Sequence, residues 1–183
     1  MLPHPAATVI LLRDPLEVLM VKRHQDLAFM GGFWVFPGGR VDAEDGSAEA
    51  AARRELAEET GIVLPEASEL VPFARWITPL GLPKRFDTWF FLVHAEGALA
   101  ASTAVVDGSE IVAARWLSPA EALADPGSLA FPTRTQLQLL ARQPSATAAL
   151  ATARETPVVT VEPEIVRDGG SPRIVVPGAP APE

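Results

Sequence analysis

The segment GGRVDAEDGSAEAAARRELAEETGI, residues 38–62, carries the clearest helix signal in the chain and an unusual distribution of charge. Ser47 is a good N-cap, and Gly61 stands where a helix often ends in a left-handed residue. Between them the alanine-rich body favours a helix. Three glutamates crowd its C-terminal end, where the helix macrodipole disfavours anions: Glu55, Glu58 and Glu59.

The spacing of these glutamates brings their side chains together, because positions i, i+3 and i+4 share one face of a helix. One interpretation is a solvated charged face, with Arg53 and Arg54 as ion-pair partners. The other is a metal site, because carboxylate oxygens are the ligands that Mg²⁺ and Mn²⁺ prefer. A divalent cation would remove the repulsion among the carboxylates and their repulsion from the helix dipole.

A glycine-rich turn just before the helix favours the second interpretation. FPGG occupies residues 36–39, five residues separate Gly39 from Asp45, and RELAEETGI follows at residues 54–62. This pattern resembles the Nudix box. Two departures affect only its first half: Asp45 stands where the family has Glu, and eight residues rather than seven separate it from Arg54. We therefore expect Asp45 either to cap the helix or to pair with Arg54.

The resemblance implies an α/β Nudix fold, a mixed sheet sandwiched between helices (α/β/α). It also implies a hydrolase that cleaves the diphosphate linkage of a nucleoside diphosphate bonded to another moiety, with Mg²⁺ or Mn²⁺ as cofactor. Arg54 would hold a glutamate in position, and Glu110, six residues before Trp116, would supply a later acid. The implied catalytic residues are Glu55, Glu58, Glu110 and Arg54. The implied metal ligands are the carbonyl of Gly38 and the carboxylates of Glu55, Glu58, Glu59 and Glu110.

The segment LMVKRHQDLAFMGGFWVFPGG, residues 19–39, is similar to the element before the box in Nudix enzymes that cleave coenzyme A and acyl-CoA. Ala28 departs from that element, because a second arginine is expected there. CoA or acyl-CoA is the leading substrate on this basis, and ADP-ribose and NADH stay open. Phe29, Phe33 and Trp34 could stack on an adenine or line a channel for an apolar chain, and core packing is the alternative role for these three side chains. The predicted substrate-binding residues are Arg23, Arg40, Lys84, Arg85 and Phe33.

Composition limits which classes of binding partner and which cellular compartment we expect. The formal net charge of −8 opposes binding to nucleic acid, and an anionic substrate would need a cation between itself and the protein. The sequence has no cysteine, which excludes disulfides and thiolate chemistry. We find no apolar run that predicts a membrane span and no signal-peptide pattern, so we expect a cytoplasmic protein whose partner is a small-molecule nucleotide.

Two other functions are compatible with the resemblance. A Nudix-fold module that binds a nucleotide without hydrolysing it often lacks box glutamates, and all three are present here. The isopentenyl diphosphate isomerase branch relies on a cysteine, which this chain lacks.

The remaining pattern predicts one domain at residues 1–155 and an extension at residues 156–183. Within the domain, turn residues at 14–15 predict a hairpin between strands at 6–13 and 17–23. The extension reads as a β-hairpin with a mobile end. Two arrangements stay open for it, packing on its own domain or on the partner subunit of a homodimer. Other strands are predicted at 33–36, 69–78, 86–95 and 110–117, and helices at 118–124, 132–143 and 146–155.

Overall fold

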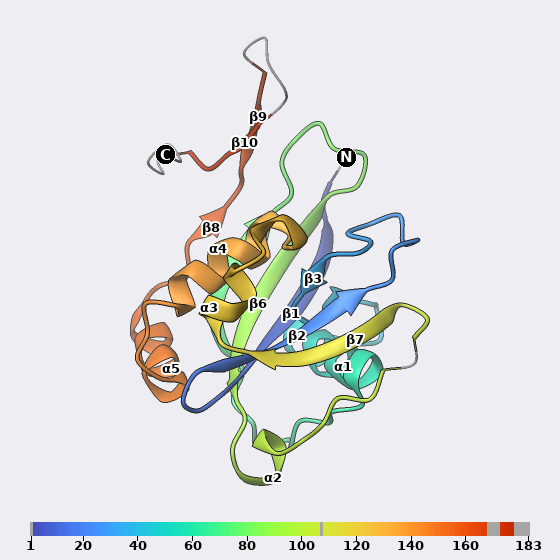
Figure 1. The fold of residues 1–183 in the computed structure, drawn as a ribbon. Helices are drawn as coiled ribbons and strands as arrows, with labels where there is room; N and C mark the ends of the chain where they lie inside the picture. The colour runs from blue at the N-terminus through green and yellow to red at the C-terminus, as the bar shows by residue number, and fades with distance from the viewer. Residues whose placement is uncertain (1, 107, 168–172, 178–183) are drawn as a thin grey trace.

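The computed structural model describes residues 2–106, 108–167 and 173–177 and contains a mixed eight-stranded sheet. Its strands are β1 (His4–Arg13), β2 (Glu17–Arg23), β3 (Trp34–Val35), β4 (Gly38–Arg40), β5 (Val71–Ile77), β6 (Phe86–His94), β7 (Ile111–Leu117) and β8 (Thr160–Val161). β1 pairs antiparallel with β2 and β4 and parallel with β6 (Figure 1). β2 also pairs with β3 and β7, and β5 lies between β6 and β8.

Helices cover both faces of this sheet. They are α1 (Ala48–Thr60), α2 (Gly97–Ala100), α3 (Pro119–Leu123), α4 (Phe131–Leu140) and α5 (Ala146–Glu155), with a 3₁₀ turn at Pro126–Ser128. α1 packs on one face, and α3, α4 and α5 pack on the other (Figure 1). The fold is therefore the expected α/β/α sandwich. Within the described part of the chain, none of these helices combines the length and apolar character that a bilayer crossing requires.

Strand β1 contributes to both hydrophobic cores. Its residues 6–12 are all buried, because successive side chains in a strand point to opposite faces and both faces are covered. Val9 and Leu11 belong to the core under α1, whereas Ile10 and Leu12 belong to the core under α4 and α5. This explains why the sequence at β1 is a continuous apolar run instead of an alternating one.

The predicted local signals are confirmed. β1 and β2 form the hairpin, with Leu12 opposite Val18. The Ser47 side chain accepts a hydrogen bond from the amide of Ala50, and Gly61 ends α1 at φ 69°. The other predicted strands and helices are present, with ends that differ by a few residues.

The chain after α5 returns to the sheet. β8 pairs in parallel with β5, opposite Arg75 and Trp76, and a separate two-stranded sheet follows, formed by β9 (Glu164–Val166) and β10 (Arg173–Val175). Figure 1 shows this pair extending from the body of the molecule beside the loop between β5 and β6. The predicted mobile end comprises residues 177–183, and all of it except Pro177 lies outside the described residues.

A close approach of β4 to β1 brings the glycine-rich turn to the start of α1. A Cβ atom on Gly38 would lie 2.5 Å from the carbonyl oxygen of Ala7 and 2.7 Å from the Cα of Thr8. A Cβ atom on Gly39 would collide with the carboxylate of Glu55. Glycine at these two positions lets β4 lie between β1 and the glutamates of α1.

Gly38→Ala should lower the melting temperature, because the added methyl group meets backbone atoms that cannot move aside. Overpacking of this kind costs about 1–3 kcal/mol, and each kcal/mol corresponds to about 2–4 °C for a chain of this size. Gly127→Ala is the matched control, because the nearest atom to its added Cβ, an Asp125 oxygen, would lie 3.6 Å away. Calorimetric melting curves that are equal for the two variants would contradict the close approach.

Candidate functional site

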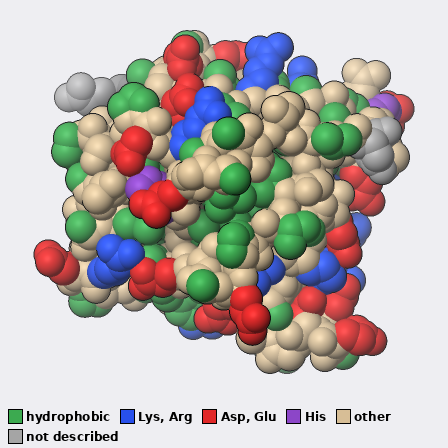
Figure 2. Space-filling model, turned by 90° about the horizontal axis from the view of Figure 1, so that it is seen from below, with side chains coloured by type: hydrophobic (Ala, Val, Ile, Leu, Met, Phe, Trp, Pro, Cys, Tyr) green, Lys and Arg blue, Asp and Glu red, His purple; other side chains and the backbone are tan. Residues whose placement is uncertain are grey.

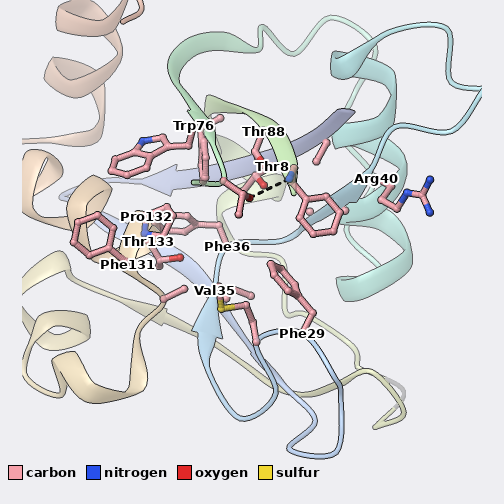
Figure 3. Close-up of a pocket in the computed structure, with 18 of the residues that line it drawn as sticks. Thr8, Phe29, Val35, Phe36, Arg40, Trp76, Thr88, Phe131, Pro132 and Thr133 are labelled. Carbon is pink, nitrogen blue, oxygen red and sulfur yellow. Dashed lines mark hydrogen bonds between the residues drawn. The ribbon is translucent and has the colours of Figure 1, made fainter. Parts of the chain in front are cut away.

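A cavity of about 560 Å³ lies over the sheet between α1 and α4 (Figure 3). Its floor is formed by β1, β5 and β6, through side chains that include Thr8, Trp76 and Thr88. One end reaches the turn at Gly38 and the glutamates of α1, and the other reaches the start of α4. The cavity therefore joins a carboxylate cluster to an apolar chamber.

The carboxylate end contains Glu55, Glu59 and Glu110. Glu59 is the most enclosed of the three: its carboxylate accepts a hydrogen bond from the amide of Gly38 at 3.0 Å and lies 3.7 Å from the guanidinium of Arg23. Burial raises the pKa of Glu59 to about 7, and the nearby charges of Glu55 and Glu110 act in the same direction. Burial also raises the pKa of Glu55.

Arg54 links the helix to the loop before it. Its guanidinium donates to Asp45 through two hydrogen bonds of 2.8 Å, to Glu55 at 2.9 Å and to Glu58 at 3.0 Å. It also donates to the backbone carbonyl of Arg40 at 3.0 Å. The bidentate pair lowers the pKa of Asp45 to about 2. Of the two roles expected for Asp45, pairing with Arg54 is the one observed, since Ser47 caps the helix.

These residues suit a divalent cation by charge and by donor type. Within the described residues, however, no three acidic or imidazole side chains converge closely enough to form a metal site by themselves. Mg²⁺ commonly binds through one or two carboxylates, with water and substrate phosphates as its other ligands. Two partly buried glutamates with raised pKa values, together with Glu110, match that pattern, because a bound cation would relieve their mutual repulsion.

The other end of the cavity is aromatic and apolar. There the rings of Trp76 and Phe131 meet edge to face with centroids 5.8 Å apart. A second pair of lining rings, Phe29 and Phe86, with centroids 5.0 Å apart, lies away from these two and nearer Arg23, whose guanidinium donates to the Phe29 carbonyl (Figure 3). The indole N–H of Trp76 is buried without a hydrogen-bond partner in the described part of the chain. This chamber contrasts with the outer face seen in Figure 2, where acidic and basic side chains are scattered among apolar and other residues. It is suited to an uncharged planar or apolar group.

Not all predicted site residues line this cavity. Of those predicted, the residues that line it are Gly38, Glu55, Glu59 and Glu110 at the carboxylate end, and the cations Arg23 and Arg40. Glu58 is 59% exposed on the outer side of α1, and Lys84 is exposed. Phe33 is not among the lining residues, whereas Phe29 and Phe36 are.

Arg85 departs most from the prediction. Its side chain is 9% exposed and donates to the carbonyl of Thr78 at 2.9 Å and to the carboxylate of Glu162 at 2.5 Å. It is thus committed to contacts within the protein and does not line the cavity. The prediction overlooked Trp76, Phe131 and Thr133, whose sequence patterns indicate only strand and helix.

The raised pKa of Glu59 predicts how the metal-free protein responds to pH. Between pH 4.5 and about 7 the folded state holds a proton on Glu59 that the unfolded state has released. The free energy of unfolding should therefore fall as pH rises through this window. Glu59→Gln should reduce that fall, as measured by melting curves in EDTA at pH 5 and pH 8.

Glu58→Gln is the matched control for this measurement, because it removes one carboxylate from the solvent side of the same helix. An equal pH dependence in wild type and Glu59→Gln would show that burial does not perturb Glu59.

Comparison with known proteins agrees with this geometry. The NUDIX domain model matches residues 2–140. A crystal structure of a NUDIX hydrolase from Alicyclobacillus acidocaldarius superposes with a TM-score of 0.73 at 25% identity, covering 86% of this chain and 99% of that one. The NUDIX domain of Shewanella oneidensis NrtR, complexed with ADP-ribose, gives a TM-score of 0.60 at 25% identity, covering 78% and 88%.

A curated relative from Bacillus subtilis (strain 168), named "Putative 8-oxo-dGTP diphosphatase", is 34% identical over 113 residues. That alignment covers 62% of this chain and 65% of the relative, so the chain spans slightly less than two thirds of the relative's length. The matched family model extends from the first strand through α4 and includes both the glycine-rich turn and the glutamate helix. This chain belongs to the Nudix family.

Proposed function

We propose that the protein is a divalent-metal-dependent diphosphatase that cleaves a nucleotide within the cavity described above. The observation that carries this proposal is the shared cavity itself: Glu55, Glu59 and Glu110 line one end, and an aromatic chamber forms the other. The carboxylate end suits metal-bound phosphates, and the chamber suits a nucleobase or another uncharged group. The matching family model and the names of the relatives support the same class of reaction.

The predicted residues at or beside the carboxylate end have proposed roles. Glu55 and Glu59 would hold Mg²⁺ or Mn²⁺, with the Gly38 carbonyl and Glu58 as further predicted ligands. A bound cation would neutralise and orient the diphosphate and acidify a water. Glu110, which is exposed at the cavity edge, would accept the proton from the attacking water. Arg54 would act as a positioning residue, because its hydrogen bonds fix Glu55 and Glu58 on α1.

Activity should disappear in excess EDTA and return with Mg²⁺ or Mn²⁺. Glu59→Gln and Glu55→Gln should each lower kcat by about a hundredfold or more, because both side chains contact the proposed metal–phosphate unit. Glu58→Gln should have a smaller effect, because Glu58 faces solvent. Release of phosphate-containing products is the measurement, and Glu49→Gln in the first turn of α1 is the control.

Full activity in EDTA would exclude the metal-dependent mechanism. If wild type binds ADP-ribose but releases no product from any nucleotide tested, the protein is a binding module instead.

The charges around the cavity favour a particular substrate class. Among the described residues, the cavity's only lining cations are Arg23 and Arg40, and both lie toward the carboxylate end with Gly38 and Glu59. We infer a substrate whose phosphates all lie at that end and whose base enters the aromatic chamber. ADP-ribose, NADH and nucleoside triphosphates with a modified base have this character. The Bacillus subtilis relative is named for a nucleotide of the last kind.

Coenzyme A is the second candidate, supported by the sequence element before the box and by Arg23 on the cavity wall. Its 3′-phosphate would need a further cation. Arg85, which was expected to supply one, is engaged with Glu162 and Thr78.

Dephospho-CoA should therefore be a better substrate than CoA, by at least about fivefold in kcat/KM, because a phosphate without a cationic partner is poorly accommodated. ADP-ribose, NADH and 8-oxo-dGTP complete the panel, assayed at equal Mg²⁺ and Mn²⁺ concentrations. A clear preference for CoA over dephospho-CoA would reverse the order of the two candidates and leave the metal-dependent reaction unaffected.

A further inference from the structure

The segment after α5 contributes to the same cavity as the glutamate helix. β8 extends the sheet beside β5, with Val161 opposite Trp76, and Trp76 lines the cavity. The chain continues through Pro163 into the β9–β10 pair, and Val176 after β10 packs against the core shared with α4 and α5. Residues 160–167 and 173–176, here named the C-terminal wall, thus touch the domain at both ends.

An ion pair between the buried Arg85 and the exposed Glu162 connects the C-terminal wall to the loop between β5 and β6. Arg85 is 9% exposed in its side chain, and its guanidinium bridges Glu162 in the wall and the carbonyl of Thr78 at the start of that loop. Charge-assisted hydrogen bonds of this kind are stronger than hydrogen bonds between neutral groups. The loop itself supplies Pro79 and Leu82 to the cavity lining. The ion pair therefore connects two parts of the same cavity side.

The C-terminal wall presents apolar side chains to the cavity. Pro163, which is buried, and Ile174, which is 43% exposed, both line it. Phe29 and Leu82 lie on the same cavity and are 38% and 40% exposed. No charged side chain of the wall's described residues lines the cavity. A charged group placed against this surface would lose water without gaining a partner.

We propose that the C-terminal wall is a specificity element, and that Ile174 contacts the part of the substrate remote from the cleaved diphosphate. This rests on the proposed function. The group selected is uncharged and planar or apolar, such as a nucleobase. The family model matches residues 2–140, so the C-terminal wall lies outside the matched range. Arg85 is a positioning residue in this scheme, since it holds Glu162 and through it Pro163 and β9.

Two neighbouring substitutions test the proposal. Ile174→Asp puts a charge on the cavity surface, whereas Val175→Asp puts the same charge on the next residue of β10, which points to the opposite face of the strand and does not line the cavity. Ile174→Asp should raise KM for the best substrate of the panel by about tenfold with kcat unchanged, because the wall lies away from the reacting atoms. Val175→Asp should change neither constant.

Ile174→Ala separates lost contact from added charge. It should raise KM by about threefold, because part of an apolar contact is removed without a new charge. Melting temperatures of the three variants identify any loss of folding. If Ile174→Asp and Val175→Asp have equal KM values, or if kcat falls while KM is constant, the C-terminal wall does not select substrate.

A second readout does not depend on turnover. The apolar fluorescent anion 8-anilinonaphthalene-1-sulfonate should bind the cavity of the wild-type protein, and Ile174→Asp should weaken its binding by about tenfold relative to Val175→Asp. If wild type hydrolyses no nucleotide of the panel while this difference in dye affinity holds, the proposed reaction is wrong, and Ile174 forms part of an apolar ligand-binding surface that does not serve that reaction. A different result would contradict the proposed role of the C-terminal wall: no dye binding or equal dye affinities for Ile174→Asp and Val175→Asp, together with equal KM values for the substrate. That result would leave the proposed reaction unaffected.

Discussion

Two glycines without side chains let a short strand lie against the central strand on one side and against a carboxylate on the other. Gly38 lies within van der Waals contact of β1 backbone, and Gly39 faces Glu55. The amide of Gly38 then donates to Glu59, which joins the turn to the last part of α1. Any side chain at these positions would separate sheet, turn and helix, and the cavity would lose the end at which its carboxylates meet.

The acidic cluster is arranged so that its charges are only partly compensated. Arg54 engages Asp45, Glu55 and Glu58, whereas Glu59 has one backbone amide and a more distant Arg23. Burial disfavours the charged forms of Glu55 and Glu59, which is the reason for their raised pKa values. A helix that places anions at its own negative end is electrostatically unfavourable, and a bound cation would reduce that cost. The unfavourable placement of three glutamates at the C-terminal end of α1, which the sequence indicated, is thus present in the folded structure.

Features that depend on contacts between residues close in sequence were predicted correctly, whereas features that depend on contacts between residues far apart in sequence were missed. The caps at Ser47 and Gly61 depend on contacts within a few residues, so their patterns were sufficient. The role of Arg85 depends on Glu162, which is 77 residues away in the sequence. Nothing in the sequence of the loop that contains Arg85 indicated that its side chain would be buried. Trp76 and Phe131 come from different elements and meet only when α4 covers the sheet. Two glutamates of the carboxylate end come from one helix, whereas the aromatic end is formed by residues from several elements that meet only in the folded protein.

Strand β1 contributes alternate side chains to the two hydrophobic cores, and this arrangement affects how the protein unfolds. Ile10 and Leu12 support α4 and α5, while Val9 and Leu11 support α1. Neither layer of helices can detach without exposing one side of the same buried strand, so the loss of one layer weakens the other. The two faces are thereby coupled into one cooperative unit. A destabilising substitution far from the glutamates, for example in the core under α5, would lower the fraction of molecules in which α1 is folded. The geometry of the carboxylates in the molecules that remain folded would not change.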